Sequence, residues 1–143
     1  MERTPLAQIL CALLFLVPIL TISSPVSAES SGDVAFSTEG LSMSPSTAVE
    51  GGDVTFTLSL QNVANTIAED VVVEFHKNSF EMGNPAALHT VDIAASSFED
   101  VDFVWSNLAW GDGEQTLFIR VNHNNDPQII SHDFDVEGLA NLR

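Results

Sequence analysis

Apolar and polar residues alternate along much of this chain, with the period of two that is typical of β-strands. In residues 54–60, four large apolar side chains on one face alternate with hydroxyl-bearing side chains on the other: Val54, Phe56, Leu58 and Leu60. The pattern predicts a strand with one buried and one solvated face.

Later segments repeat this alternation. Their predicted inward-facing sets are Val71, Val73 and Phe75; Val91 and Ile93; Val101, Phe103 and Trp105; Leu117, Ile119 and Val121; and Ile130, Phe134 and Val136. The same parity places Glu74, His76 and Arg120 on the solvated face. A broken first strand is expected at residues 33–37 and 41–43, and a short edge strand at residues 80–82. About seven short strands separated by turn signals predict an all-β fold, an immunoglobulin-like or fibronectin type III-like antiparallel β-sandwich.

The first 28 residues have the pattern of a signal peptide. Arg3 precedes an apolar run at residues 6–22, whose densest part, residues 10–20, is shorter than the ~20 residues that span a bilayer. Small residues up to Ala28 predict cleavage before Glu29, which leaves residues 29–143 as one secreted, extracellular or cell-surface domain. An uncleaved N-terminal anchor is the alternative.

The cysteine content and the net charge limit the disulfides and the partners that the domain can have. Cys11, in the leader, is the one cysteine, so the mature domain is expected to have no disulfide. The chain has 20 acidic and 4 basic side chains, a formal net charge of −16. Such a charge repels nucleic acid and anionic membrane surfaces, which we exclude as partners. Because the acids are scattered, solubility in a salty exterior is favoured over a cation-binding surface, and both interpretations stay open.

Short motifs across the mature chain resemble those of a known family. They are residues 49–57 (VEGGDVTFT), Asn62, Ala68 with residues 71–75 (VVVEF), residues 103–105 (FVW) and residues 113–117 (GEQTL). Together they resemble the CARDB family, the cell adhesion related domain found in bacteria and archaea. The resemblance implies an immunoglobulin-like sandwich used for adhesion or scaffolding, and it brings no catalytic residues. Ala64, Asn65 and His76 depart from the family pattern.

One loop offers a candidate metal site. Asn122, Asn124, Asn125 and Asp126 carry several oxygen ligands, which calcium favours. The same residue types are also selected by a plain turn, and this interpretation is favoured because the loop has one carboxylate. Calcium is the only cofactor that the sequence suggests.

Two further segments are candidate contact surfaces. Trp110 and Asp112, in a glycine-rich turn, form a candidate ligand-binding pair for an extracellular protein or carbohydrate, and capping of the core by Trp110 is an equal alternative. Glu99, Asp100 and Asp102 are the densest acidic segment. Outward charges that discourage edge pairing explain this segment more simply than a cation site does.

Catalysis has no visible basis, because the sequence has no Gly-x-Ser-x-Gly motif and no cysteine nucleophile in the mature part. None of the four histidines lies in a metal-binding motif, and the parity of His132 predicts an inward or rim position. We therefore expect a non-catalytic binding, adhesion or surface-assembly module. The alternatives are a small metal-dependent hydrolase using His76, His89 or His123, and a fragment of a multidomain surface protein. The sequence leaves the ligand and the oligomeric state open.

Overall fold

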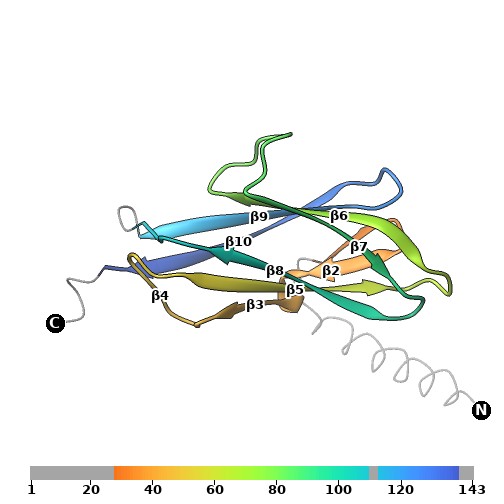
Figure 1. Cartoon of the computed structure of the whole chain (residues 1–143), viewed down its shortest axis with the longest axis horizontal. Helices are drawn as coiled ribbons and strands as arrows, with labels where there is room; N and C mark the ends of the chain where they lie inside the picture. The colour runs from red at the N-terminus through yellow and green to blue at the C-terminus, as the bar shows by residue number, and fades with distance from the viewer. Residues whose placement is uncertain (1–27, 110–112, 139–143) are drawn as a thin grey trace, which may run out of the picture.

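The computed structural model describes residues 28–109 and 113–138. Over these residues the chain forms ten strands and one short 3-10 helix, arranged in two stacked layers (Figure 1). The elements are β1 (Ala28–Ser31), β2 (Val34–Ser37), η1 (Thr38–Gly40), β3 (Leu41–Ser44), β4 (Ala48–Val49), β5 (Val54–Asn62), β6 (Ala68–Lys77), β7 (Ala87–Ile93), β8 (Phe98–Trp105), β9 (Glu114–Asn122) and β10 (Gln128–Glu137). Among the described residues, no helix is long and apolar enough to cross a membrane.

The two sheets have the strand order of an immunoglobulin-like sandwich. In the first sheet, β1, β2, β5 and β3 lie in the order β1-β2-β5-β3, and β8 also pairs with β5. In the second sheet, the order is β4-β10-β9-β6-β7. The short β4 pairs with β10 in parallel, whereas the other pairs are antiparallel. The all-β sandwich predicted from the alternation is therefore confirmed.

The broken first strand is also confirmed. β2 pairs with the last residues of β5, from Val34 opposite Asn62, and β3 pairs with an earlier part, from Leu41 opposite Leu58. The 3-10 helix η1 separates these two pieces. The sandwich contains more strands than expected because this first segment is divided and because β1 and β4 add short pairs at the sheet margins.

The inner faces of the two sheets form one hydrophobic core. All four apolar residues of β5 predicted to face inward are completely buried, as are Val71, Val73 and Phe75 of β6. Aromatic rings join the layers: Phe75 stacks on Phe103 at 5.0 Å, and Phe134 meets Trp105 edge-on at 5.1 Å. Each large side chain buried in this way contributes about 1.5–3 kcal/mol relative to an exposed position.

On the outer face of β6, the burial of side chains differs from the sequence prediction. Glu74 and His76, expected to be solvated, are buried. The predicted edge strand at residues 80–82 does not form, because residues 78–86 are a loop containing a turn at Gly83 (φ +80°). The ring of Phe80 lies 4.4 Å from that of His76, so this loop covers the outer face of β6 at His76. Figure 1 shows the loop, in green, rising from the sheet between β6 and β7.

Asn62 closes the end of the sandwich at which β5 ends. Its side chain is buried, and its Nδ2 donates hydrogen bonds to the carbonyls of Thr66 (2.7 Å), Ile93 (3.0 Å) and Ala94 (3.2 Å). Its Oδ1 accepts a hydrogen bond from the amide of Ala64 at 3.0 Å. One amide thus connects the loop after β5 with the end of β7 in the opposite sheet.

We expect Asn62→Ala to lower the free energy of unfolding by about 2–4 kcal/mol, since it leaves buried backbone groups without partners. Urea denaturation measures this loss. The matched control is Asn65→Ala, an exposed position in the same loop, which should change stability by less than about 0.5 kcal/mol. Equal effects of the two substitutions would show that the Asn62 network does not stabilise the fold.

Candidate binding site

A hollow of about 570 Å³ lies at one end of the sandwich. It is formed where the β1–β2 turn, the β5–β6 loop and the β9–β10 turn come together, at the right-hand end of Figure 1. Three carboxylate side chains line it, from Asp33, Glu69 and Asp70. No lysine or arginine is among its lining residues. The hollow therefore has a strongly negative wall.

A β-bulge brings two of these carboxylates into place. The pairing of β6 with β7 shifts between Ala68 and Val71, so that Glu69 and Asp70 have no partner in the ladder. Asp70 adopts a left-handed backbone with φ +55°, and its amide donates to the Asp92 carboxylate at 2.9 Å. Bulges of this kind redirect side chains next to binding sites. Here both bulged residues line the hollow.

The β9–β10 turn supplies three amide side chains to the same wall. Asn122, Asn124 and Asn125, three residues of the predicted calcium loop or turn, line the hollow. Asn124 and Asn125 have φ of +56° and +58°, a backbone region that asparagine tolerates better than most residues. The geometry of a tight turn thus accounts for two of the three asparagines.

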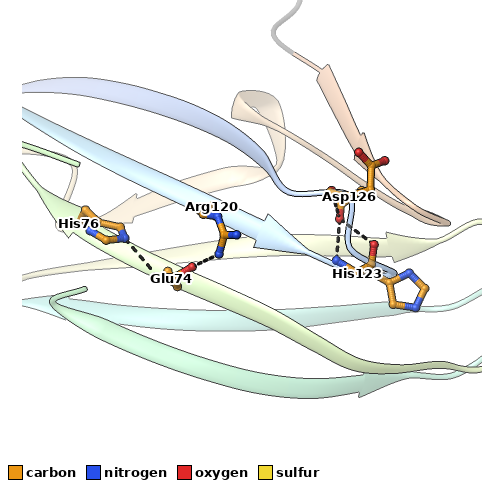
Figure 2. A network of polar contacts seen from close by, with 6 residues as sticks. Glu74, His76, Arg120, His123 and Asp126 are labelled. Carbon is orange, nitrogen blue, oxygen red and sulfur yellow. Dashed lines mark hydrogen bonds and ion pairs between the residues drawn. The ribbon is translucent and has the colours of Figure 1, made fainter. Parts of the chain in front are cut away.

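Asp126, the fourth residue of the predicted calcium loop, does not line this hollow. Its Oδ2 accepts a hydrogen bond from the amide of Gly32 at 3.2 Å, and its Oδ1 accepts one from Gln128 Nε2 at 3.0 Å. Ser31 Oγ donates to the Asp126 carbonyl (2.6 Å) and accepts from the amide of His123 (2.7 Å), part of the contacts around Asp126 and His123 in Figure 2. Asp126 therefore holds the β9–β10 turn against the β1–β2 turn.

Gly32 is needed at this contact. It has φ +55°, and a Cβ built on it would lie 2.8 Å from His123 Nδ1. A larger residue would be strained in its backbone and would also push the buried His123 ring away. The two turns that form the hollow are consequently packed directly against each other.

The histidines proposed for a hydrolase do not lie together. His89 is paired opposite Val73 and contacts the inward ring of Phe75 at 5.9 Å, whereas His76 lies on the outer face of β6. His123 is at the β9–β10 turn. No group of three or more His, Cys, Asp or Glu side chains among the described residues is placed to hold a metal ion. His132 lies on the inner face, with its ring 6.1 Å from that of Phe56, as its parity predicted.

A buried polar cluster occupies the outer face of β6 and β9 (Figure 2). Arg120, expected to point into solvent, forms an ion pair with the buried Glu74 carboxylate. His76 Nε2 lies 3.6 Å from the other Glu74 oxygen and has no hydrogen-bond partner. The cluster is separate from the hollow and has a structural explanation, since Arg120 compensates the charge of a buried carboxylate.

The comparisons with known proteins identify the fold. No family model and no curated protein sequence matches the chain. The solution structure of a CARDB domain from Pyrococcus furiosus is similar, with a TM-score of 0.52 at 15% identity over 73% of this chain and 94% of that one. A crystal structure of the same domain, in complex with di-metal ions, gives a TM-score of 0.50 at 15% identity over 68% and 90%.

A third similar structure is a larger protein. The Pseudomonas fluorescens alkylpurine DNA glycosylase AlkC, bound to DNA, matches with a TM-score of 0.52 at 13% identity, over 73% of this chain and 30% of that one. At these identities the likeness shows the fold alone. The chain has the fold of a CARDB domain, as the motifs at residues 49–57 and 71–75 indicated.

Several sequence predictions are not tested by the described residues, and one group of site residues was not predicted. Trp110 and Asp112 lie outside the described residues, as do residues 1–27 of the predicted leader, so these predictions remain untested. Ala28, the expected last residue of the leader, is the first residue of β1. The acids of the hollow, Asp33, Glu69 and Asp70, were missed. Asp33 is far in the sequence from the other two, which lie on a bulge. The sequence contained only two signals for them, an aspartate in a turn and an acidic pair before residues 71–73.

We expect Arg120→Leu to destabilise the protein by about 3–5 kcal/mol, because it leaves the Glu74 carboxylate buried without its cation. The double variant Glu74→Leu/Arg120→Leu should recover most of this loss, since an apolar pair removes both charges. Urea denaturation of the wild type, both single variants and the double variant at about pH 7 gives the coupling between the two residues. Additive effects would contradict a buried ion pair.

Proposed function

We propose that this chain is a secreted, non-catalytic binding module, and that it contacts an extracellular partner through the acid-lined hollow. Loops at the end of a rigid sandwich are the usual place for binding surfaces in immunoglobulin-like folds. The observation that carries the proposal is the convergence of Asp33, Glu69 and Asp70, from two separate parts of the chain, on one hollow whose lining has no lysine or arginine.

The charge of this wall indicates the chemistry of the partner. Carboxylates attract lysine and arginine side chains, and the amide oxygens of the lining asparagines accept hydrogen bonds from the same groups. Ile67 and Val72 also line the hollow and offer apolar surface to the alkyl stem of such a side chain. These features favour a basic segment of an extracellular protein over a neutral carbohydrate. Nucleic acid and anionic membranes are excluded by the same charge.

A metal ion fits the described residues less well. The similar Pyrococcus domain was crystallised with di-metal ions. In this chain, Asp126 uses both carboxylate oxygens in hydrogen bonds, and no three acids or histidines of the described parts are grouped for one ion. Carboxylates that are spread around a wall suit an extended cation, such as a guanidinium on its stem, better than a compact one.

The calcium hypothesis for residues 122–126 has a direct test. A ligand that binds only the folded state raises the melting temperature. Because both carboxylate oxygens of Asp126 are already used in hydrogen bonds, we expect the melting temperature to be the same, within about 1 °C, in millimolar calcium and in excess chelator. Differential scanning calorimetry measures this. A rise of several degrees in calcium would support the calcium site and contradict the assignment of Asp126 to a purely structural role.

The cationic-partner hypothesis predicts binding of a hexa-arginine peptide. In titrations of the ¹⁵N-labelled protein, amide shifts should be concentrated in the β1–β2 turn, the β5–β6 bulge and the β9–β10 turn. The triple variant Asp33→Asn, Glu69→Gln, Asp70→Asn should weaken binding by about three-fold to a hundred-fold, since three exposed ion pairs of ~0.2–1 kcal/mol each are removed.

The control is a second triple variant with the same net charge as the first. Glu39→Gln, Glu81→Gln and Glu114→Gln neutralise three exposed carboxylates that do not line the hollow. Equal weakening by both triple variants would mean that the peptide responds only to total charge, and the hollow would then not be a site.

A further inference from the structure

Strand β8 has a free edge. It pairs with β5 along its whole length, from Phe98 opposite Gln61 to Trp105 opposite Val54. Within residues 28–109 and 113–138, no other strand pairs with it. In seven-stranded immunoglobulin domains the corresponding strand, E, is covered by strand D on this side. Here the chain passes from β7 in the other sheet through residues 94–97 directly into β8, so that place in the sheet is open.

A free edge of this kind offers backbone N–H and C=O groups to an added strand. Its side chains decide which strand fits. The outward face of β8 presents Phe98, Asp100, Asp102 and Val104, while Val101, Phe103 and Trp105 point into the core. Phe98 is 64% exposed and Val104 is 53% exposed. The outer face therefore reads apolar, acidic, acidic, apolar.

The two carboxylates have no cation opposite them. Their partners on β5 are neutral, with Asp100 opposite Ser59 and Asp102 opposite Thr57, whose hydroxyl donates to Asp102 at 2.7 Å. No ion pair to either carboxylate is present in the described part of the chain. Opposite charges at directly facing positions stabilise a strand pair, and like charges destabilise it.

A second copy of the chain is a poor occupant. Antiparallel pairing of two β8 strands centred on Val101 would set each Asp100 opposite an Asp102, which juxtaposes four carboxylates. The net charge of −16 on each copy adds a general repulsion. The acids thus disfavour self-association while leaving the edge open to a strand of opposite charge.

We propose that the free edge of β8 accepts an extended, basic segment of a partner protein by strand addition. Lysine or arginine side chains of this segment face Asp100 and Asp102, and apolar side chains face Phe98 and Val104. Because side chains on one face recur at every second residue, the matching segment reads apolar-x-basic-x-basic-x-apolar. This pattern is the same in both directions, so it fits parallel or antiparallel addition. The surface is distinct from the hollow, since none of these four residues lines it.

The test uses the peptide VTKTKTV, with VTETETV as its charge control. We expect the lysine peptide to shift the amide resonances of β8 and to slow hydrogen exchange at alternate residues of residues 98–105. The glutamate peptide should do neither. A lysine peptide N-methylated at alternate residues keeps its charge and loses its edge hydrogen bonds, so it should not slow the exchange. Equal protection by the methylated peptide, or no effect at β8 at millimolar concentration, would overturn strand addition.

Variants of the protein separate this surface from the hollow. Asp100→Asn/Asp102→Asn should weaken binding of the lysine peptide by about two-fold to thirty-fold, from two facing charge pairs. Asp100→Lys/Asp102→Lys should reverse the preference toward the glutamate peptide, which loss of folding cannot produce. The triple variant of Asp33, Glu69 and Asp70 should leave β8 binding intact. Loss of β8 binding in that variant, or an unchanged preference in the lysine variant, would contradict the proposal.

Discussion

The fold depends on the packing of two inner sheet faces, because nothing covalent holds the layers together. With a single cysteine in the chain, no disulfide can form within it. The completely buried residues of β5 pack in one core with Phe75 of β6 and with Leu117 and Ile119 of β9. A domain of this size must gain its stability from such burial, which follows directly from strict alternation along the strands. The turns at the ends of the sandwich are positioned by this core.

Asn62 connects the core to the loops at the end of the sandwich where the hollow lies. It is the last residue of β5, and the same alternation that buries Leu60 also buries its amide. There it bonds the carbonyls of Ile93 and Ala94 in one sheet and the loop after β5 in the other. A buried amide whose groups are all paired specifies one loop conformation, because alternatives would leave polar atoms unsatisfied. The polar loop that lines the hollow is thus held by a hydrogen-bonded anchor.

The sequence predicted the strands well and the site poorly, for one physical reason. Alternation reports which face of a strand a residue occupies, and it correctly placed Phe56, Val101 and His132. It does not report what covers the other face, so the burial of Glu74 beside Arg120, and of His76 against Phe80 of the 78–86 loop, was missed. Likewise, the bulge at Glu69 and Asp70 breaks the period of two, and no local pattern relates these residues to Asp33.

The hydrogen bonds of the acidic side chains show that these residues have different roles in the fold. Scattered acids along a sequence suggest solubility, yet in the fold they separate into two kinds. Asp92 and Asp126 accept backbone hydrogen bonds and support turns, as Asp53 does for the amide of Asn107. The carboxylates of Asp33, Glu69 and Asp100 accept no such bond in the described structure, and no lysine or arginine lines the hollow or pairs opposite Asp100. Like charges held together in this way repel one another, so a cationic partner gains both its own attraction and the relief of that repulsion.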